Sequence, residues 1–327
     1  METVMRSRNL KGPYEACPFN PILGRKNPRA YIQRSGHGQP VSTPDGRWYM
    51  VYLCGRKTEG RTVMGRETAL DPLEWTADGW PMVNGLKGPS CLQVRPDAEL
   101  KAGGGQGRNG AETAEAGRDS QGWNDAETAE AARDPQTERT EEREDWIAPR
   151  TDPKTFAEEQ DGAFLVKGGA DPAGRGPCSL LLCRQREAGF RQSAEADLSA
   201  CGEGSAAGLA GYYDERSFFL FLARRTGNGL RLEAVEQIGE ERKTRVLGTR
   251  SGLRIRMAVT AEGLTRHLWV AEDETWKELG CLRTEYLSDE GLTGGKRFTG
   301  ALLGMAAIGE GTARFEQHKI RFEARPN

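Results

Sequence analysis

The most regular pattern in the chain is an alternation of apolar and polar residues in its C-terminal half. From Leu253 to Val259, apolar side chains occupy every second position, with Arg254 and Arg256 between the first of them. This period of two is typical of an antiparallel strand that is buried on one face. Nine segments between residues 145 and 327 read as strands, without helical periodicity, and predict a two-sheet β-sandwich: Ser179–Arg184, Phe190–Leu198, Gly208–Tyr213, Phe218–Ala223, Arg231–Gln237, Leu253–Thr260, Arg266–Ala271, Ala301–Ala307 and Ala313–Phe322.

Residues 1–97 also show short strands and turns. Arg47–Arg56 is an aromatic and β-branched run that follows the turn residues Pro44-Asp45-Gly46. A second strand is predicted over Thr62–Leu70. Two more short strands are predicted on either side of Asp78-Gly79. The pattern is typical of a propeller blade or of packed sheets.

The segment 98–144 differs from the rest of the chain. Leu100 and Trp123 are its only large apolar side chains, and a near-repeat joins 111–119 to 126–134. So little apolar surface cannot offset an ordering entropy of about 1–2 kcal/mol per residue. We therefore predict a disordered, low-complexity linker or insertion between the two β regions.

Charge and cysteine content narrow the classes of function. With 46 basic and 48 acidic residues, the net charge of −2 gives no electrostatic case for a nucleic-acid or membrane partner. No apolar run approaches the roughly 20 residues that cross a bilayer. The seven cysteines form no CxxC pair and have no histidine at zinc-ligand spacing. They are interpreted as free thiols in a reducing compartment, and we expect a cytoplasmic location.

Several short strings together resemble glycoside hydrolase family 43, specifically its β-xylosidases. In the first 97 residues they match the last blades of that family's five-bladed propeller. In the last 183 they match the concanavalin A-like β-sandwich attached to it. The strings are Gly12–Glu15, Asn20–Leu23, Ser35–Gly38, Asp45–Arg56, Gly65–Thr68, Glu74–Trp80, Ser179–Gln185, Ala207–Glu215 and Phe298–Ala301. The resemblance thus implies an all-β chain, with a partial propeller over 1–97 and a sandwich over 145–327. The sandwich is expected to be able to fold alone, and the partial propeller to be marginally stable or to depend on contacts with the sandwich.

The catalytic carboxylates of this family are not expected in the chain. Family members invert the anomeric centre with a general base, a general acid and a third carboxylate that tunes the acid, with the base in a Pro-Asp-Pro context and the acid before Gly-Pro. Neither triplet occurs in these 327 residues, and Arg6–Leu10 corresponds to a point past both. We therefore expect the chain alone to be inactive. The missing blades are expected to be encoded upstream of Met1, or to have been lost through a frameshift or a misplaced start.

Three residues are implied as substrate-binding by the resemblance. His37 matches a histidine near the propeller axis, Arg66 an arginine that faces the glycone subsite, and Phe298 an aromatic ring on a sandwich loop that closes the pocket. A guanidinium can hold two sugar hydroxyls and keeps its charge at any working pH. The alternatives are an ordinary surface or core histidine, a strand-surface ion pair of Arg66 with Glu67 or a neighbouring residue, and an ordinary core phenylalanine. Arg56 is expected to shape its loop.

The implied function is exo-acting hydrolysis of β-1,4-xylosides or α-L-arabinofuranosides, with xylo- or arabino-oligosaccharides as partners. The alternative is a non-catalytic carbohydrate-binding or scaffolding module built on the sandwich. A homo-oligomer or a complementing propeller fragment is left open as a partner. No cofactor is expected, except that a structural Ca²⁺ is weighed at two carboxylate pairs: Asp289 with Glu290, and Glu310 with Glu316. His267 and His318 are expected to be structural.

Overall fold

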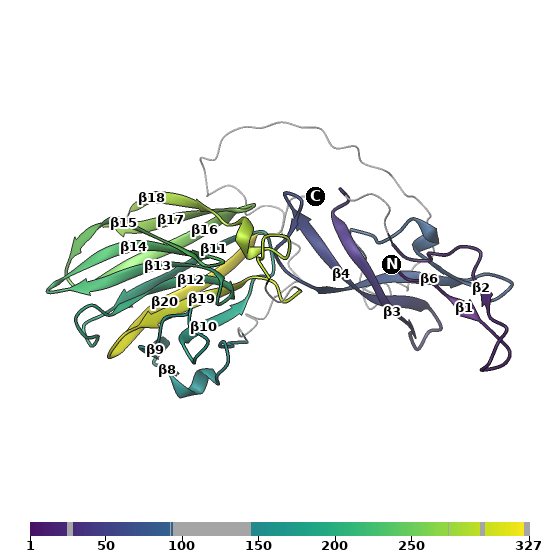
Figure 1. Cartoon of the computed structure of the whole chain (residues 1–327), viewed down its shortest axis with the longest axis horizontal. Helices are drawn as coiled ribbons and strands as arrows, with labels where there is room; N and C mark the ends of the chain where they lie inside the picture. Colours follow the sequence, from purple (N-terminus) through teal and green to yellow (C-terminus); the bar gives the residue numbers. More distant parts are fainter. Residues whose placement is uncertain (25–28, 92, 94–144, 274, 295–297, 324–327) are drawn as a thin grey trace, which may run out of the picture. The chain divides into compact units, whose positions relative to one another are not determined.

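A computed structural model describes residues 1–24, 29–91, 93, 145–273, 275–294 and 298–323. The segment predicted as a linker, 98–144, lies outside the described residues. Met1–Cys91 and Asp145–Asn327 belong to one compact unit, which is built of strands (Figure 1). The 3₁₀ helices in its described part are short: η1 (Asn84–Leu86), η2 (Pro153–Thr155) and η3 (Glu285–Leu287). No described helix is long and apolar enough to cross a membrane.

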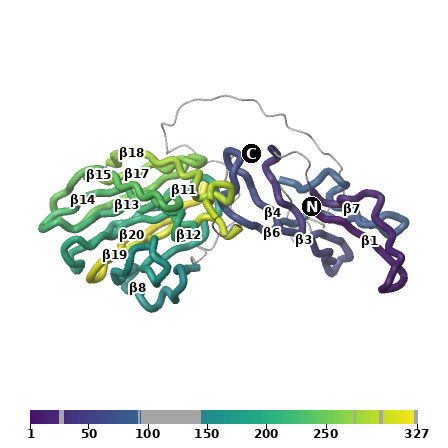
Figure 2. The backbone as a smooth tube through the Cα atoms, in the orientation of Figure 1, coloured from purple at the N-terminus to yellow at the C-terminus, as the bar shows by residue number. Residues whose placement is uncertain are grey.

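The N-terminal part of this unit is an antiparallel meander of the kind that forms a propeller blade. Its strand order is β3-β4-β6-β7, with β5 paired to β4 (Figure 2). A separate two-stranded sheet joins β1 to β2. The turn at Asp45-Gly46 connects β3 to β4, as predicted, and is closed by the Thr43 N–H, which donates to the Arg47 carbonyl (2.8 Å). The bounds are β1 (Met5–Arg6), β2 (Glu15–Ala16), β3 (Ile32–Ser42), β4 (Trp48–Thr58), β5 (Arg61–Thr62), β6 (Glu67–Trp75) and β7 (Pro81–Val83).

The strand predicted over Thr62–Leu70 is wrong in its middle. The chain leaves the sheet after Thr62 and rejoins it at Glu67. Between them, Val63 and Met64 are only 1% and 4% exposed and belong to the core cluster of the C-terminal sandwich. The apolar residues that suggested a continuous strand therefore serve a different core from that of the sheet around them.

The C-terminal part is a sandwich of two antiparallel sheets (Figure 1). The six-stranded sheet has the order β10-β19-β12-β13-β14-β15, and the seven-stranded sheet the order β18-β17-β16-β11-β20-β9-β8. The bounds are β8 (Ala157–Gln160), β9 (Ala163–Lys167), β10 (Ser179–Arg184), β11 (Gly189–Asp197), β12 (Ala206–Asp214), β13 (Ser217–Thr226), β14 (Gly229–Ile238), β15 (Glu241–Ser251), β16 (Arg254–Glu262), β17 (Thr265–Glu272), β18 (Thr275–Arg283), β19 (Leu302–Ile308) and β20 (Thr312–Glu323).

The main core lies between the two sheets. Phe219 and Phe221 of β13 meet Met257 and Val259 of β16 in one cluster of buried residues. All nine strand segments predicted in this region are found, displaced by one to three residues at some ends. Four further strands were not predicted, namely β8, β9, β15 and β18. Of these, β8, β15 and β18 lie at sheet edges and are mostly exposed, so their sequences carry no clean alternation.

The outer face of the six-stranded sheet is also buried. Leu180, Leu220 and Leu222 are fully buried there, in a second apolar cluster against which Ala173 packs. From the same connection, Asp171 reaches Arg242 of β15, whose guanidinium donates to both carboxylate oxygens at 2.7 and 2.8 Å. The connection between β9 and β10 therefore covers this face.

Two residues of the N-terminal region complete the core of the sandwich, while the blade has a buried cluster of its own that includes Ile22, Tyr52 and Val83. That the sandwich folds alone stays a prediction. Val63→Ala should lower the free energy of unfolding by about 2 kcal/mol, because it removes buried methyl groups and leaves a void among sandwich residues. The matched control is Val246→Ala, since Val246 is 57% exposed on β15 and should change stability by no more than about 0.5 kcal/mol. Urea unfolding followed by circular dichroism measures both, and equal losses would contradict the burial of Val63 in the sandwich core.

A histidine within the sandwich gives the fold a pH dependence. The ring of His318 packs against those of Trp146 and Phe164, with centroids 5.3 and 6.1 Å away. Desolvation at this position lowers the pKa of His318 to about 4. As the pH falls below about 6.5, the usual histidine pKa, the unfolded chain binds a proton at His318 that the folded chain does not bind, and this favours unfolding.

The contribution of neutral His318 to stability should therefore be complete above about pH 6.5 and decline as the pH falls toward 4. His318→Phe keeps an aromatic ring but cannot titrate, so its melting temperature should fall less over this range. Thermal melts of both proteins between pH 7 and 4 measure the difference. Parallel pH profiles would contradict the assignment of this loss to His318.

Candidate functional site

The residues implied as substrate-binding come together at one cavity. Its volume is about 460 Å³, and its lining is drawn from β3, β4, the segment after β5 and the loop before β19. The lining residues are Met1, Arg34, Gly36, His37, Leu53, Arg66 and Phe298. His37, Arg66 and Phe298 thus meet, although up to 261 positions separate them in the sequence. The described lining contains no Asp or Glu.

Strand β3 is irregular where it contributes to the cavity. Its register against β4 shifts on both sides of Gly36, and Arg34 and His37 have positive φ angles of 57° and 55°. Bulges re-aim side chains, and positive φ at residues other than glycine is concentrated at functional positions. These two irregularities bring Arg34 and His37 to the cavity, where both are exposed.

Arg66 is placed by a close approach of two backbones. An added Cβ at Gly65 would lie 2.5 Å from the backbone nitrogen of Gly300, so the chain can pass only because both residues are glycine. The next residue, Arg66, donates its backbone N–H to the carbonyl of Phe298 at 3.1 Å. Its guanidinium lies over the Phe298 ring, 4.1 Å from the centroid, at cation–π distance.

The alternatives to substrate binding can be compared with these contacts. Glu67 forms its ion pair with Arg56 at 2.8 Å, and no ion pair of Arg66 occurs within the described part of the chain. Phe298 is 42% exposed and so is not a core phenylalanine. Arg56, which lies in β4, also bonds Glu187 at 2.7 Å and so links this strand to the sandwich.

Arg34 is a cavity residue that the sequence analysis missed. Its guanidinium donates to the Asp289 carboxylate and, at 2.9 Å, to Glu290. Glu290 also accepts hydrogen bonds from the backbone N–H and the hydroxyl of Thr62, at 2.7 and 3.0 Å. Burial works against ionisation of Glu290, but these donors outweigh it and hold its pKa below the usual range. Only the positive φ in β3 marks Arg34, and φ cannot be read from a sequence.

The carboxylates weighed for Ca²⁺ do not fit that ion. The oxygens of Asp289 face three donors, from Tyr213, Arg34 and Phe298, which occupy the lone pairs that a cation would need. Glu316 pairs with Arg314 at 2.6 Å. The described residues contain no group of three or more His, Cys, Asp or Glu side chains placed to hold a metal.

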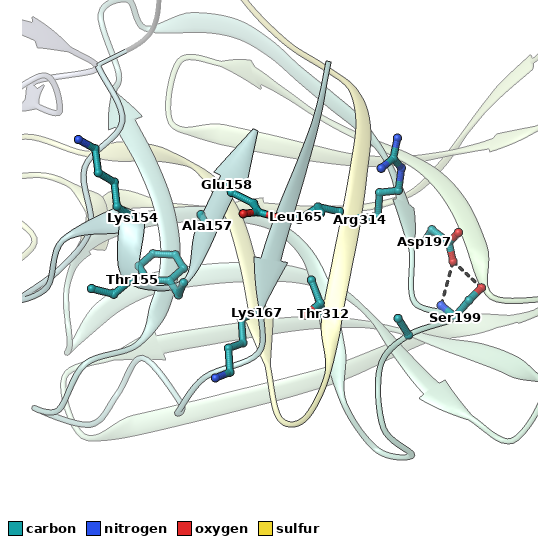
Figure 3. Close-up of a pocket in the computed structure, with 12 residues that line it drawn as sticks. Lys154, Thr155, Ala157, Glu158, Leu165, Lys167, Asp197, Ser199, Thr312 and Arg314 are labelled. Carbon is teal, nitrogen blue, oxygen red and sulfur yellow. Dashed lines mark hydrogen bonds between the residues drawn. The ribbon is translucent and has the colours of Figure 1, made fainter. Parts of the chain in front are cut away.

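A larger cavity, of about 550 Å³, lies on the sandwich and contains none of the implied residues. Figure 3 shows Glu158, Leu165 and Arg314 along its strands, and Asp197 hydrogen-bonded to Ser199 at its edge. Asp197 also pairs with Arg254 at 2.8 Å. Asp197, one of the two acidic residues that line this cavity, is thus already paired. Because the three implied residues meet at the smaller cavity, that one is the candidate site.

Comparison with known proteins assigns the family. Residues 1–81 match the model of glycosyl hydrolases family 43, and residues 138–321 match that of the β-xylosidase C-terminal concanavalin A-like domain. The second model alone covers more than half of the chain. This chain therefore belongs to glycosyl hydrolase family 43, with the blade and sandwich arrangement of its β-xylosidase-type members.

Relatives and solved structures agree with this assignment. A xylosidase/arabinosidase 43B of Humicola insolens is 32% identical over 323 residues, covering 93% of this chain and 55% of the relative. A β-xylosidase of Bacillus subtilis is 40% identical over 96 residues, covering 26% of this chain and 18% of the relative. The crystal structure of a family 43 protein of Bacillus licheniformis superposes with a TM-score of 0.76 at 28% identity, over 98% of this chain and 60% of that one. The chain thus spans 55% of the length of the Humicola insolens relative and 60% of that of the Bacillus licheniformis structure.

The close approach at Gly65 provides a test of how Arg66 is placed. Gly65→Ala should lower the free energy of unfolding by about 2 kcal/mol or more, because its Cβ meets the Gly300 backbone and its φ of 74° disfavours any side chain. Gly60→Ala is the matched control, since φ is 80° there and nothing lies within 4 Å of the new Cβ. It should show the cost of φ alone. Equal losses in thermal or urea unfolding would mean that the two backbones are not closely packed.

Proposed function

We propose that this chain forms the substrate-facing C-terminal portion of an exo-acting family 43 β-xylosidase or α-L-arabinofuranosidase. The observation that carries the proposal is the cavity at which His37, Arg66 and Phe298 meet. Sugars are bound by aromatic rings that pack on the ring face and by polar groups that hydrogen-bond the hydroxyls. The cavity offers an exposed aromatic ring, an imidazole, and a guanidinium without an ion-pair partner in the described chain. The names of the relatives support xylo- or arabino-oligosaccharides as ligands.

Binding without hydrolysis is the expected activity of the chain by itself. Inverting hydrolysis takes a carboxylic acid and a carboxylate about 6.5–9.5 Å apart on opposite sides of the bond. None of the described residues that line the cavity is Asp or Glu, and the carboxylates of Asp289 and Glu290 behind Arg34 are hydrogen-bonded to that residue. The acid and base would therefore come from a complementing polypeptide, or from residues that are not in this sequence.

The alternative of a binding module built on the sandwich alone finds less support. The outer face of the six-stranded sheet is apolar, buried and covered by the connection that carries Asp171. The candidate cavity, moreover, takes most of its lining from β3, β4 and Arg66, outside the sandwich. A reducing, cytoplasmic location remains part of the proposal and is supported by the exposed thiols of Cys91 and Cys281, neither of which forms a disulfide among the described residues.

Calorimetric titration with xylobiose, and in parallel with an arabinofuranoside, tests the proposal. The unmodified chain should bind at least one of them at millimolar concentration and should not hydrolyse nitrophenyl xyloside or arabinofuranoside. Arg66→Ala should weaken binding about tenfold or more, because a charge-assisted hydrogen bond contributes about 1.5–3 kcal/mol.

The control for that measurement is Arg175→Ala, since the Arg175 side chain is 90% exposed and lies away from the cavity lining. Its affinity should be unchanged. No heat with either sugar would overturn the proposed site. Turnover comparable to that of a full-length family enzyme would overturn the expectation that the chain is inactive alone.

A further inference from the structure

We propose that Asp289 is a positioning residue, which holds the Phe298 ring over the sugar-binding cavity by accepting the Phe298 backbone N–H. This inference rests on the proposed function for its ligand. It concerns a carboxylate that belongs to the sandwich and does not line the cavity.

Phe298 has a backbone conformation that is unfavourable for any residue with a side chain. Its φ is 87°, a region that L side chains rarely adopt and that costs about 1–3 kcal/mol. Burial of the ring cannot hold it there, because the residue is 42% exposed. Its backbone must therefore be fixed by its neighbours.

Both backbone groups of Phe298 are tied. Its N–H donates to Asp289 Oδ1 at 3.1 Å, and its carbonyl accepts the Arg66 N–H at 3.1 Å. The first bond comes from the sandwich and the second from the segment between β5 and β6. The ring then lies near two guanidinium groups, 4.1 Å from that of Arg66 and 5.6 Å from that of Arg34.

Asp289 is itself rigidly held. It is fully buried and accepts hydrogen bonds from the Tyr213 hydroxyl and the Arg34 guanidinium, as well as from Phe298. Its own N–H donates to the Thr62 carbonyl at 3.0 Å. Burial, with the neighbouring carboxylate, raises the pKa of Tyr213 and keeps its hydroxyl a donor. The buried carboxylate thus joins β3, β12 and Phe298, while the backbone N–H of Asp289 joins β5. A buried acceptor with three donors has little freedom to move.

Glu290 provides a matched comparison. It bonds the same Arg34 at 2.9 Å and the same Thr62, but it makes no hydrogen bond to Phe298. A general loosening of the contacts between β3 and the sandwich would follow from changing either acid. Release of Phe298 would follow only from changing Asp289.

The test uses the full chain with three single variants, Asp289→Ala, Glu290→Ala and Phe298→Ala, and the double variant of Asp289 and Phe298. Alanine removes the side-chain acceptor, whereas asparagine would retain an oxygen that can accept the Phe298 N–H. Hydrogen exchange at the Phe298 amide should be at least tenfold faster in Asp289→Ala and unchanged in Glu290→Ala. In xylobiose titrations, Asp289→Ala should weaken binding as much as Phe298→Ala does. The double variant should be no weaker than Phe298→Ala alone, since the two changes then remove one and the same contact.

An unchanged Phe298 amide in Asp289→Ala, equal exchange in Glu290→Ala, or additive losses in the double variant would overturn the inference. Should Asp289→Ala not fold, Asp289→Glu retains the charge facing Arg34 while displacing the carboxylate oxygens, and the same exchange and binding losses are expected. Should the unmodified chain bind neither sugar, the proposed function fails, whereas the exchange data still decide the role of Asp289.

Discussion

The structure depends on one insertion, in which the chain between β5 and β6 leaves its own sheet to complete the core of the sandwich. Val63 and Met64 supply the apolar side chains of that insertion, and Gly65 allows the backbone to pass against Gly300. Because apolar burial is the dominant favourable contribution to folding, the burial of these two side chains in the sandwich joins the two β regions more firmly than a linker could. The blade and the sandwich consequently belong to one compact unit, although they match separate family models and the blade keeps a buried cluster of its own.

Polar contacts around the insertion then fix how the N-terminal region packs against the sandwich. Arg34 meets Asp289 and Glu290, Arg56 meets Glu187, and Glu59 accepts the Leu264 N–H at 2.9 Å. Exposed ion pairs contribute little stability, but a buried carboxylate with well-placed donors fixes one geometry in preference to others. Asp289 is the buried member of this set, so it is the one best able to define where its neighbours stand.

The candidate site follows from the same arrangement. Neither β region contains the cavity, because β3 and β4 form one wall and Phe298 reaches in from the sandwich side. The strained backbone of Phe298 and the irregular register of β3 both occur at this boundary. Strain of this kind persists only where surrounding contacts over-determine it, and here those contacts come from the partner region. The site is therefore a property of the joined unit.

The sequence by itself determined the β class, the sandwich, most of its strands and three members of the cavity. It could do so because a period of two is typical of a strand with one buried face, as at Leu253–Val259. His37 and Arg66 were implied by the resemblance of their short motifs to family 43. Edge strands such as β15 were not predicted, because a mostly exposed strand shows no alternation of apolar and polar residues. Only the tertiary structure decided that Val63 and Met64 belong to the sandwich core, that Arg34 faces the cavity and that Asp289 holds Phe298. These depend on contacts between residues far apart in the chain, and local patterning does not encode which distant core an apolar residue will join.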